Sequence, residues 1–199
     1  MIYFQGLNVG TFYTISTLMN QSLVPYYPTE AVNIGRIGSV IVISGMFGSV
    51  ACGLWLSKTR KFKLTLSLVY SLSFCGMLLY SVTIGNCSIW VIFFVAAFMG
   101  FFMTGYLPLG FEYAAEITYP VSEDIASSFL NCSAQIFGIM MTLGIGQMLQ
   151  NISVISCNIT LTALMAIGSV VTCEIISFIC ESCEHCLYKQ LASRLWLFF

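Results

Sequence analysis

The sequence predicts an all-α polytopic membrane protein, folded as a bundle of six transmembrane helices. Apolar residues make up 58% of the 199 positions, charged residues only 8%, and the mean hydropathy is +0.92. A soluble domain carries roughly a quarter charged residues, so this chain has too few to cover a surface that faces water. The apolar residues also recur in six separate stretches rather than one leading run, so a cleaved signal peptide does not explain them.

Each stretch is long enough to cross a bilayer, because a spanning helix needs about 20 predominantly apolar residues. In order, the predicted spans are residues 2–24, 37–56, 64–84, 89–110, 125–149 and 159–180. The connections between them are too short to hold a second domain, so residues 1–182 are expected to form one bundle. Residues 183–199 mix basic with apolar side chains, which predicts a cytosolic juxtamembrane tail lying on the membrane.

The basic residues predict the orientation in the membrane. They concentrate in the second connection and after the last span, which lie on one side, while Arg36 alone lies opposite; the concentrated residues are Lys58, Arg60, Lys61, Lys63, Lys189 and Arg194. The positive-inside rule therefore makes both termini cytosolic. The sequons at Asn86, Asn151 and Asn158 fall in connections on the other side, which predicts a glycoprotein, most simply of the plasma membrane. Two further sequons, at Asn20 and Asn131, lie within helices and are read as coincidental.

The fifth span has one polar face. Ser127, Asn131, Gln135, Gly138 and Thr142 follow one another at spacings of three or four residues, which place all five on one side of a helix. One interpretation is that these side chains hold the helix against a neighbour. The other is that they line a water-filled cavity, where Gln135 near mid-membrane offers a donor and an acceptor to a polar solute.

The first span shows a weaker version of the same pattern. Tyr13, Ser16, Thr17 and Asn20 share a face. A tyrosine ring that faces a cavity attracts a cation through its quadrupole, by about 0.5–2 kcal/mol depending on desolvation. The alternative is that Tyr13 only packs, with its hydroxyl group bonded to a neighbour.

Glycine and proline mark two further spans. We expect Gly45, Gly48 and Gly53 of the second span to permit close approach of another helix. In the fourth span, Gly105, Pro108 and Gly110 predict an interruption near the cytosolic end, because proline lacks a backbone donor.

The cysteines, the histidine and the acids give no enzymatic constellation. Cys180, Cys183, His185 and Cys186 form a compact cluster after the last span that suits S-acylation, or no modification, better than a closed zinc site. Cys87 and Cys157 both fall on the predicted extracytosolic side, which allows a disulfide if the fold brings them together. Glu174 is the one acid well inside a predicted span. We expect no catalytic activity, metal or cofactor, and a net charge of −1 gives no reason to expect nucleic-acid binding.

Several motifs resemble one family. They are Gly105-Tyr106-Leu107-Pro108-Leu109-Gly110-Phe111-Glu112 with Glu116-Ile117-Thr118-Tyr119-Pro120, Asn131-Cys132-Ser133-Ala134-Gln135-Ile136-Phe137-Gly138, Ile15-Ser16-Thr17-Leu18-Met19-Asn20, and Val32-Asn33-Ile34-Gly35-Arg36-Ile37-Gly38. Over residues 6–149 the chain is similar to the feline leukaemia virus subgroup C receptor-related transporters of the major facilitator superfamily. That resemblance implies a protein of twelve helices in two halves, of which the six spans here resemble the C-terminal half.

The resemblance also implies a substrate and a site. The family is described as transporting choline and ethanolamine or as exporting heme, so the expected ligand is a small organic cation or heme. Gln135 matches a glutamine of the central cavity, and Tyr13 is the best counterpart of an aromatic residue there. With Asn131 and Asn20 on the same two polar faces, the candidate substrate-binding residues are Gln135, Tyr13, Asn131 and Asn20.

Two hypotheses about function remain. The first is the C-terminal half of a facilitated-diffusion carrier that works by alternating access when joined to an N-terminal half. The second is a truncated, non-transporting form that regulates or partners full-length carriers. Either protein would have the lipid bilayer as its surroundings and a carrier half or full-length carrier as its partner.

Overall fold

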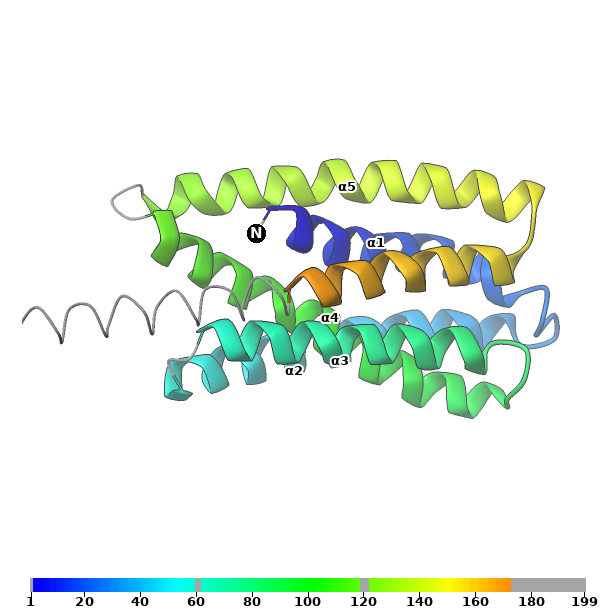
Figure 1. Cartoon of the computed structure of the whole chain (residues 1–199). Coiled ribbons are helices and arrows are strands. Elements are labelled where there is room, and N and C mark those ends of the chain that lie inside the picture. Colours follow the sequence, from blue (N-terminus) through cyan, green and yellow to red (C-terminus); the bar gives the residue numbers. More distant parts are fainter. Residues whose placement is uncertain (1, 60–61, 119–121, 173–199) are drawn as a thin grey trace, which may run out of the picture.

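The computed structural model describes residues 2–59, 62–118 and 122–172, and within them the chain is helical apart from short turns. The labelled helices are α1 (Ile2–Leu23), α2 (Ala31–Thr59), α3 (Phe62–Thr83), α4 (Ile89–Thr118) and α5 (Glu123–Asn151). A further helix, Val154–Thr172, returns alongside the bundle after α5 (Figure 1). The prediction of an all-α polytopic membrane fold is confirmed.

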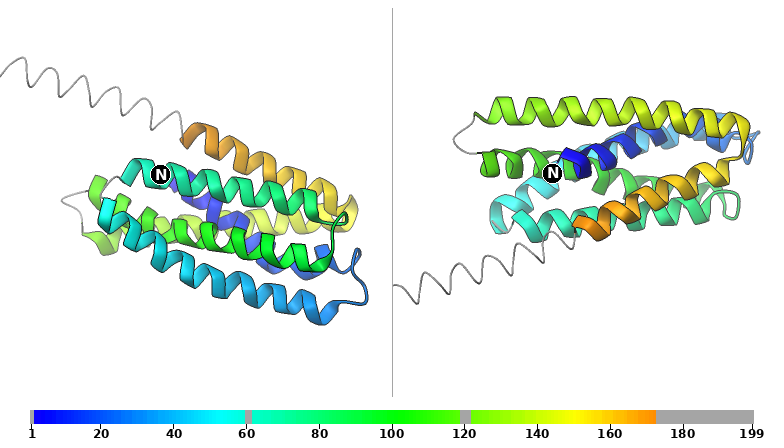
Figure 2. Two further views of the ribbon diagram at one scale, coloured as in Figure 1. Left: turned by 90° about the horizontal axis from the view of Figure 1, so that it is seen from below. Right: turned by 45° about the horizontal axis from the view of Figure 1, so that its top comes forward.

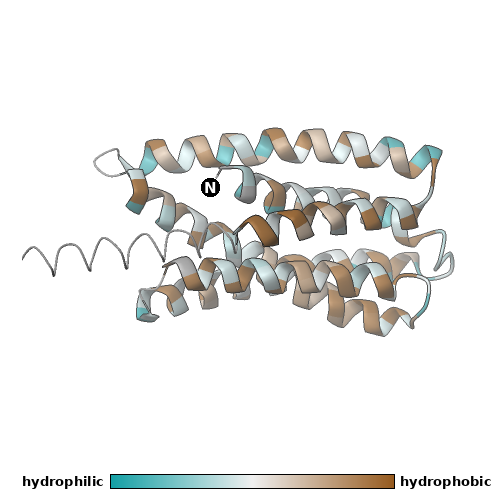
Figure 3. Cartoon of the chain, in the orientation of Figure 1, coloured by the Kyte–Doolittle hydropathy of each residue, from teal (hydrophilic) through white to brown (hydrophobic). Residues whose placement is uncertain are grey.

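Five of these helices are long and apolar enough to cross a membrane, and α1 is not among them. The reason is polar content, since α1 contains Gln5, Asn8, Thr11 and Thr14, all buried within the bundle. Residues 2–23 nevertheless form a helix close to the predicted first span of residues 2–24, which stays a prediction as a membrane span. Helix α1 packs chiefly on α5 and also contacts α4 and α2 (Figures 1 and 3).

The helix ends differ from the predicted ones in three places. Helix α2 begins at Ala31 instead of residue 37, α4 continues to Thr118 instead of ending at residue 110, and the last helix begins at Val154 instead of residue 159. Glu174, the end of the last span, the cysteine and histidine cluster and the tail 183–199 lie outside the described residues.

Helix α4 runs unbroken through Pro108, so the predicted interruption is wrong. A proline removes only one backbone donor, and neighbouring helices can hold the segment in place. Here α4 crosses two helices at this segment. A Cβ atom at Gly105 would lie 2.7 Å from the sulfur of Cys52 in α2, and one at Gly110 would lie 2.6 Å from the amide carbon of Gln5 in α1. The two glycines therefore serve helix contact.

Helices α2 and α4 form the closest pair in the lower half of Figure 1. A Cβ atom at Gly48 would overlap the backbone of Phe101, 2.7 Å from its carbonyl carbon, and one at Gly100 would lie 2.6 Å from the carbonyl oxygen of Ile41. A Cβ atom at Gly45 would lie 2.6 Å from Oγ1 of Thr104. The expectation of close approach is confirmed for Gly45 and Gly48. It is wrong for Gly53, which has no atom of another element within 4 Å because it points away from α4.

At the end of the bundle opposite the α2–α3 connection, the α1–α2 connection packs on the turn between α3 and α4. The hydroxyl group of Tyr27 donates a hydrogen bond to the carbonyl oxygen of Cys87. Gly85 has a φ of 79°, and a Cβ atom there would lie 2.8 Å from the ring of Tyr26. Glycine is thus required both by the turn and by the ring that covers it.

The same end holds the predicted sequons and the two cysteines. Asn86 is exposed in the turn between α3 and α4, and Asn151 is exposed as the last residue of α5. Asn158, however, is only 5% exposed and lies inside the last helix, so its placement in a connection is wrong: only two residues separate α5 from that helix. Cys87 is exposed, Cys157 is buried, and both are free, so the structure contains no disulfide between them.

We predict opposite effects of two alanine substitutions in α2. Gly48→Ala should lower the free energy of unfolding by about 1–3 kcal/mol, because the new methyl group meets the backbone of Phe101, which cannot move aside without displacing α4. Gly53→Ala should leave stability unchanged or raise it by up to about 1 kcal/mol, because alanine favours a helix over glycine. Reversible unfolding of the purified protein in detergent, followed by circular dichroism, measures both. Equal effects of the two substitutions would contradict the close α2–α4 contact.

Candidate functional site

The candidate site begins with the contact between α1 and α5, which three glycines make close. A Cβ atom at Gly6 would lie 2.5 Å from the ring of Phe137, and one at Gly10 would lie 3.3 Å from the backbone nitrogen of Gly138. The backbones of α1 and α5 therefore run against each other near their middles. Small residues of this kind let membrane helices approach closely.

Tyr13 and Gln135 meet across this contact. The side-chain Nε2 of Gln135 donates a hydrogen bond to the hydroxyl oxygen of Tyr13 at 3.3 Å. The ring of Tyr13 occupies the space beside Gly138, where a Cβ atom would lie 2.9 Å from its Cδ2. Tyr13 is half-buried and Gln135 is exposed, so both still offer surface to a ligand. The structure thus brings two of the four candidate residues together.

The other residues of the α5 polar face have two different surroundings. Further along α5, Thr142 shares a hydrogen bond of 3.2 Å with Thr14 of α1, which joins the two helices. Toward the beginning of α5, Ser127 and Asn131 line an open cavity. The two interpretations of this face, helix contact and cavity lining, therefore apply to different turns of one helix.

The other two candidate residues do not touch the Tyr13–Gln135 pair. Asn131 is one helical turn before Gln135 and exposed, on the wall of the cavity. Asn20 is exposed on α1, about 10 Å along the helix axis from Tyr13 at the usual rise of ~1.5 Å per residue. A single ligand as small as choline would reach Asn131 more readily than Asn20 from the Tyr13–Gln135 pair.

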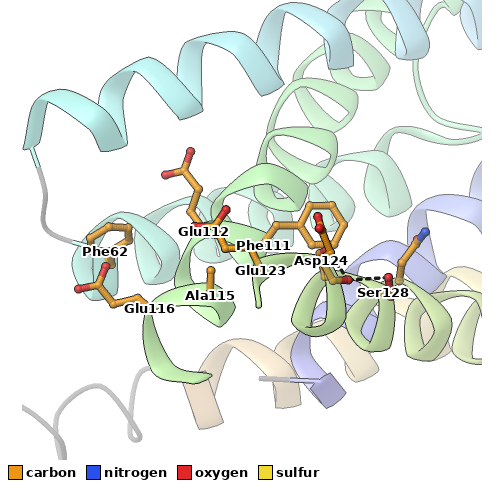
Figure 4. A pocket seen from close by; sticks show the side chains of 10 residues that line it. Phe62, Phe111, Glu112, Ala115, Glu116, Glu123, Asp124 and Ser128 are labelled. Atoms are coloured by element: carbon orange, nitrogen blue, oxygen red, sulfur yellow. Dashed lines mark hydrogen bonds between the residues drawn. The ribbon is translucent and has the colours of Figure 1, made fainter. Parts of the chain in front are cut away.

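The cavity lies between the end of α4 and the beginning of α5 and has a volume of about 1000 Å³ (Figure 4). Four carboxylates line it: Glu112, Glu116, Glu123 and Asp124. The hydroxyl groups of Ser127 and Ser128 donate to the backbone carbonyl oxygen of Asp124, so they leave its carboxylate free of those bonds. No basic side chain lines the cavity within the part of the chain that the structure describes. Such a surface concentrates cations.

Two buried amides near this site were not singled out from the sequence. Gln5 and Asn8 are fully buried, and neither side-chain amide has a hydrogen-bond partner among the described residues. Thr11 and Thr14, on the same stripe of α1, are satisfied by backbone carbonyl oxygens of their own helix. The spacing of three residues through positions 5, 8, 11 and 14 is the signal that would have identified this stripe.

Residues that could hold a metal ion do not gather within residues 2–59, 62–118 and 122–172: no group of three or more histidine, cysteine, aspartate or glutamate side chains has suitable geometry. The four carboxylates of the cavity are therefore spread along its wall. The cysteine and histidine cluster after the last span is outside these residues.

A bundle of long apolar helices with a polar, partly open face on α1 and α5 defines a class of protein: an integral, multi-pass membrane protein. Comparison with known proteins identifies the family. The chain is 50% identical over 167 residues to the choline/ethanolamine transporter flvcr2a of Danio rerio, 48% identical over 167 residues to FLVCR2 of Homo sapiens, and 51% identical over 168 residues to FLVCR1 of Mus musculus. It belongs to this family of major facilitator-type transporters and matches the C-terminal part of its relatives.

These matches cover 84% of the chain but only 36%, 32% and 30% of the three relatives, so the chain spans about a third of their length. An MFS-type transporter of Caenorhabditis elegans is 47% identical over 170 residues, which are 85% of this chain and 29% of that protein. No family model matches the chain. The similarity is longer than the stretch of residues 6–149 over which motifs had indicated it.

We predict that Gly138 positions the ring of Tyr13. In Gly138→Ala the new methyl group meets that ring, so Tyr13 should move and lose its hydrogen bond from Gln135. Gly144→Ala is the matched control, because Gly144 lies on the same helix with no atom of another element within 4 Å. A fluorinated tyrosine at position 13, observed by ¹⁹F NMR in detergent, should shift in Gly138→Ala and in Gln135→Ala but not in Gly144→Ala. An unshifted resonance in Gly138→Ala would show that Gly138 does not set the ring position.

Proposed function

We propose that this chain is the C-terminal half of a facilitated-diffusion carrier for choline or ethanolamine, which works by alternating access when joined to an N-terminal half. The observation that carries the proposal is the Tyr13–Gln135 pair, held on a polar face that leads into a cavity lined by carboxylates. The names of the relatives, choline/ethanolamine transporters, supply the substrate class.

The chemistry of the proposed site favours an organic cation. A quaternary ammonium group binds over an aromatic ring, which Tyr13 would provide once the substrate shields it from water. The amide of Gln135 would fix the Tyr13 hydroxyl group and offer its own oxygen to the hydroxyl group of choline. Asn131, on the cavity wall, would meet the substrate on its way, and Asn20 would meet it toward the other end of α1.

Heme is the competing substrate, and the cavity argues against it. Heme carries two propionates, which the carboxylates of Glu112, Glu116, Glu123 and Asp124 would repel. A choline cation would instead be attracted. We therefore propose the cation as the ligand of this half.

The proposed orientation places both termini and this cavity at the cytosolic end, in the plasma membrane. The start of α1, the end of α2, the start of α3, the end of α4 and the start of α5 lie toward one end of the bundle (Figure 1). The basic residue Lys58 is at this end, in the last turn of α2. The exposed sequons at Asn86 and Asn151 are at the other end and would be open to glycosylation there.

We predict that Tyr13→Ala and Gln135→Ala reduce choline uptake. The protein to test is this chain joined to the N-terminal half of the Danio rerio relative, expressed in cells that lack choline uptake of their own. Loss of the ring should lower uptake at low choline concentration by about 2- to 30-fold, the range expected for one cation–ring contact. Loss of the Gln135 amide should lower it by about 2- to 10-fold, as for one neutral hydrogen bond.

The control for this experiment is Gln147→Ala, an exposed amide three turns further along α5. Uptake is compared at equal amounts of protein on the cell surface. Normal uptake in both site variants would refute the assignment of the site. If the joined protein transports nothing, while this chain lowers uptake by a co-expressed full-length relative, the chain is instead a non-transporting regulator.

We predict that the cavity carboxylates assist the entry of a cation. Glu123→Gln combined with Asp124→Asn should lower choline uptake severalfold at low ionic strength and less at high ionic strength, because salt screens exposed charges. The matched control is Glu30→Gln, an acid outside this cavity. An increase in heme transport by the double variant, with choline uptake unchanged, would favour heme as the substrate.

A further inference from the structure

An apolar groove opens on the side of the bundle away from the candidate site. Helices α2 and α3 each pack along α4 but scarcely touch each other (Figure 2, left). Near the α2–α3 connection this leaves a groove of about 300 Å³, with α4 as its floor; it is lined by Trp55 and Thr59 of α2, Leu64, Thr65 and Leu68 of α3, and Phe102 of α4. This volume is at the lower end of the range of about 300–1,000 Å³ for small-molecule pockets.

The rim of the groove is apolar and exposed. Its rim residues Trp55, Leu64 and Leu68 are 65%, 60% and 58% exposed, and all are apolar. In Figure 1, α2 and α3 lie on the opposite side of the bundle from α5, whose polar face forms the candidate site. In a membrane, lipid tails surround such a surface. An empty groove would lose dispersion contacts along its walls. An acyl chain is therefore the occupant that fits its lining.

A positive charge lies at the end of the groove. Lys58 is exposed in the last turn of α2, one helical turn beyond Trp55 and on the same face. The sequence that follows adds Arg60, Lys61 and Lys63. A lysine at a helix end extends its ammonium group to the level of the lipid headgroups. A basic residue at this level attracts anionic phospholipids.

The nearest acids lie on the inner side of α2. Glu112 and Glu116 line a separate cavity together with Leu56 and Ser57. Ser57 is two residues from both Trp55 and Thr59, about 200° around the helix, so it lies on nearly the opposite face of α2. These acids therefore meet α2 at the cavity that Ser57 lines and do not line the groove.

We propose that this groove is a binding site for one anionic phospholipid of the adjoining leaflet. One of its acyl chains lies between α2 and α3 on Phe102, and its phosphate group is held by Lys58. The proposal is independent of the transport function, because it uses none of the residues assigned to the Tyr13–Gln135 site.

Quenching of Trp55 fluorescence by brominated lipids tests the proposal, because bromine quenches tryptophan on contact. The chain has three tryptophans, so Trp90→Phe with Trp196→Phe leaves Trp55 as the only reporter. The protein is reconstituted in phosphatidylcholine bilayers that contain brominated phosphatidylserine or brominated phosphatidylcholine. Phosphatidylserine should quench Trp55 at a mole fraction about fivefold lower than phosphatidylcholine, the enrichment expected from one basic residue near the surface.

Two variants separate a specific site from general attraction. Lys58→Gln should reduce the preference for phosphatidylserine about fivefold. Thr59→Phe, which keeps Lys58 but fills the mouth of the groove, should also abolish it, since the acyl chain loses its place. A protein with Trp90 as its only tryptophan is the internal control, because Trp90 is exposed at the opposite end of the bundle and should show no preference.

Three results would overturn the proposal. They are equal quenching of Trp55 by the two lipids, a preference that is unchanged in Lys58→Gln, and a preference that survives Thr59→Phe. The last result would mean that the basic residues enrich anionic lipid near the protein without a groove site. Circular dichroism of each variant in the same bilayers verifies that the helices remain folded.

Discussion

Close contact between helix backbones is the constraint on which the rest of this structure depends. Within a bilayer, lipid tails are as apolar as leucine, so helices associate through packing and polar contacts instead of escape from water. Here Gly10 and Gly138 bring α1 against α5, while Gly48 and Gly100 bring α2 against α4. Gly110 then seats α1 on α4 through Gln5. The Tyr13–Gln135 pair takes its geometry from these contacts, because Tyr13 stands in space that only a glycine leaves open.

Helix α1 has polar residues on two faces, one buried within the bundle and one accessible. On its inner stripe, Thr11 and Thr14 bond to their own backbone, whereas the amides of Gln5 and Asn8 are buried without a partner among the described residues. A buried amide without a hydrogen bond costs roughly 1–3 kcal/mol on protein scales. On its outer face, Tyr13 and Asn20 remain accessible. A helix that is polar on both sides is poorly suited to face lipid, which agrees with its place among other helices and with its low hydropathy.

Features that depend on residue spacing within one helix could be predicted from the sequence. Features that depend on contact with a second helix could not. The polar face of α5 follows from periodicity alone, and the structure shows Gln135, Gly138 and Thr142 all directed at α1. Gly48 and Gly53 are both glycines of α2, but only Gly48 faces α4. The spacing of the glycines did not reveal this difference. The extension of α4 past Pro108 also depends on tertiary contacts at Gly105 and Gly110. The motifs sufficed to indicate the family, which the comparison with known proteins bears out.

One end of the bundle combines basic residues with a cavity lined by carboxylates. In the orientation we propose, that end faces the cytosol because it is rich in lysine and arginine, yet the cavity there is lined by four carboxylates. The positive-inside rule counts basic residues, and acidic ones contribute little to it. The acids between α4 and α5 therefore leave the orientation unchanged, while Lys58 in the last turn of α2 supports it. In the two proposals made above, Lys58 would meet an anionic lipid, whereas the acidic residues of the cavity would meet a cation.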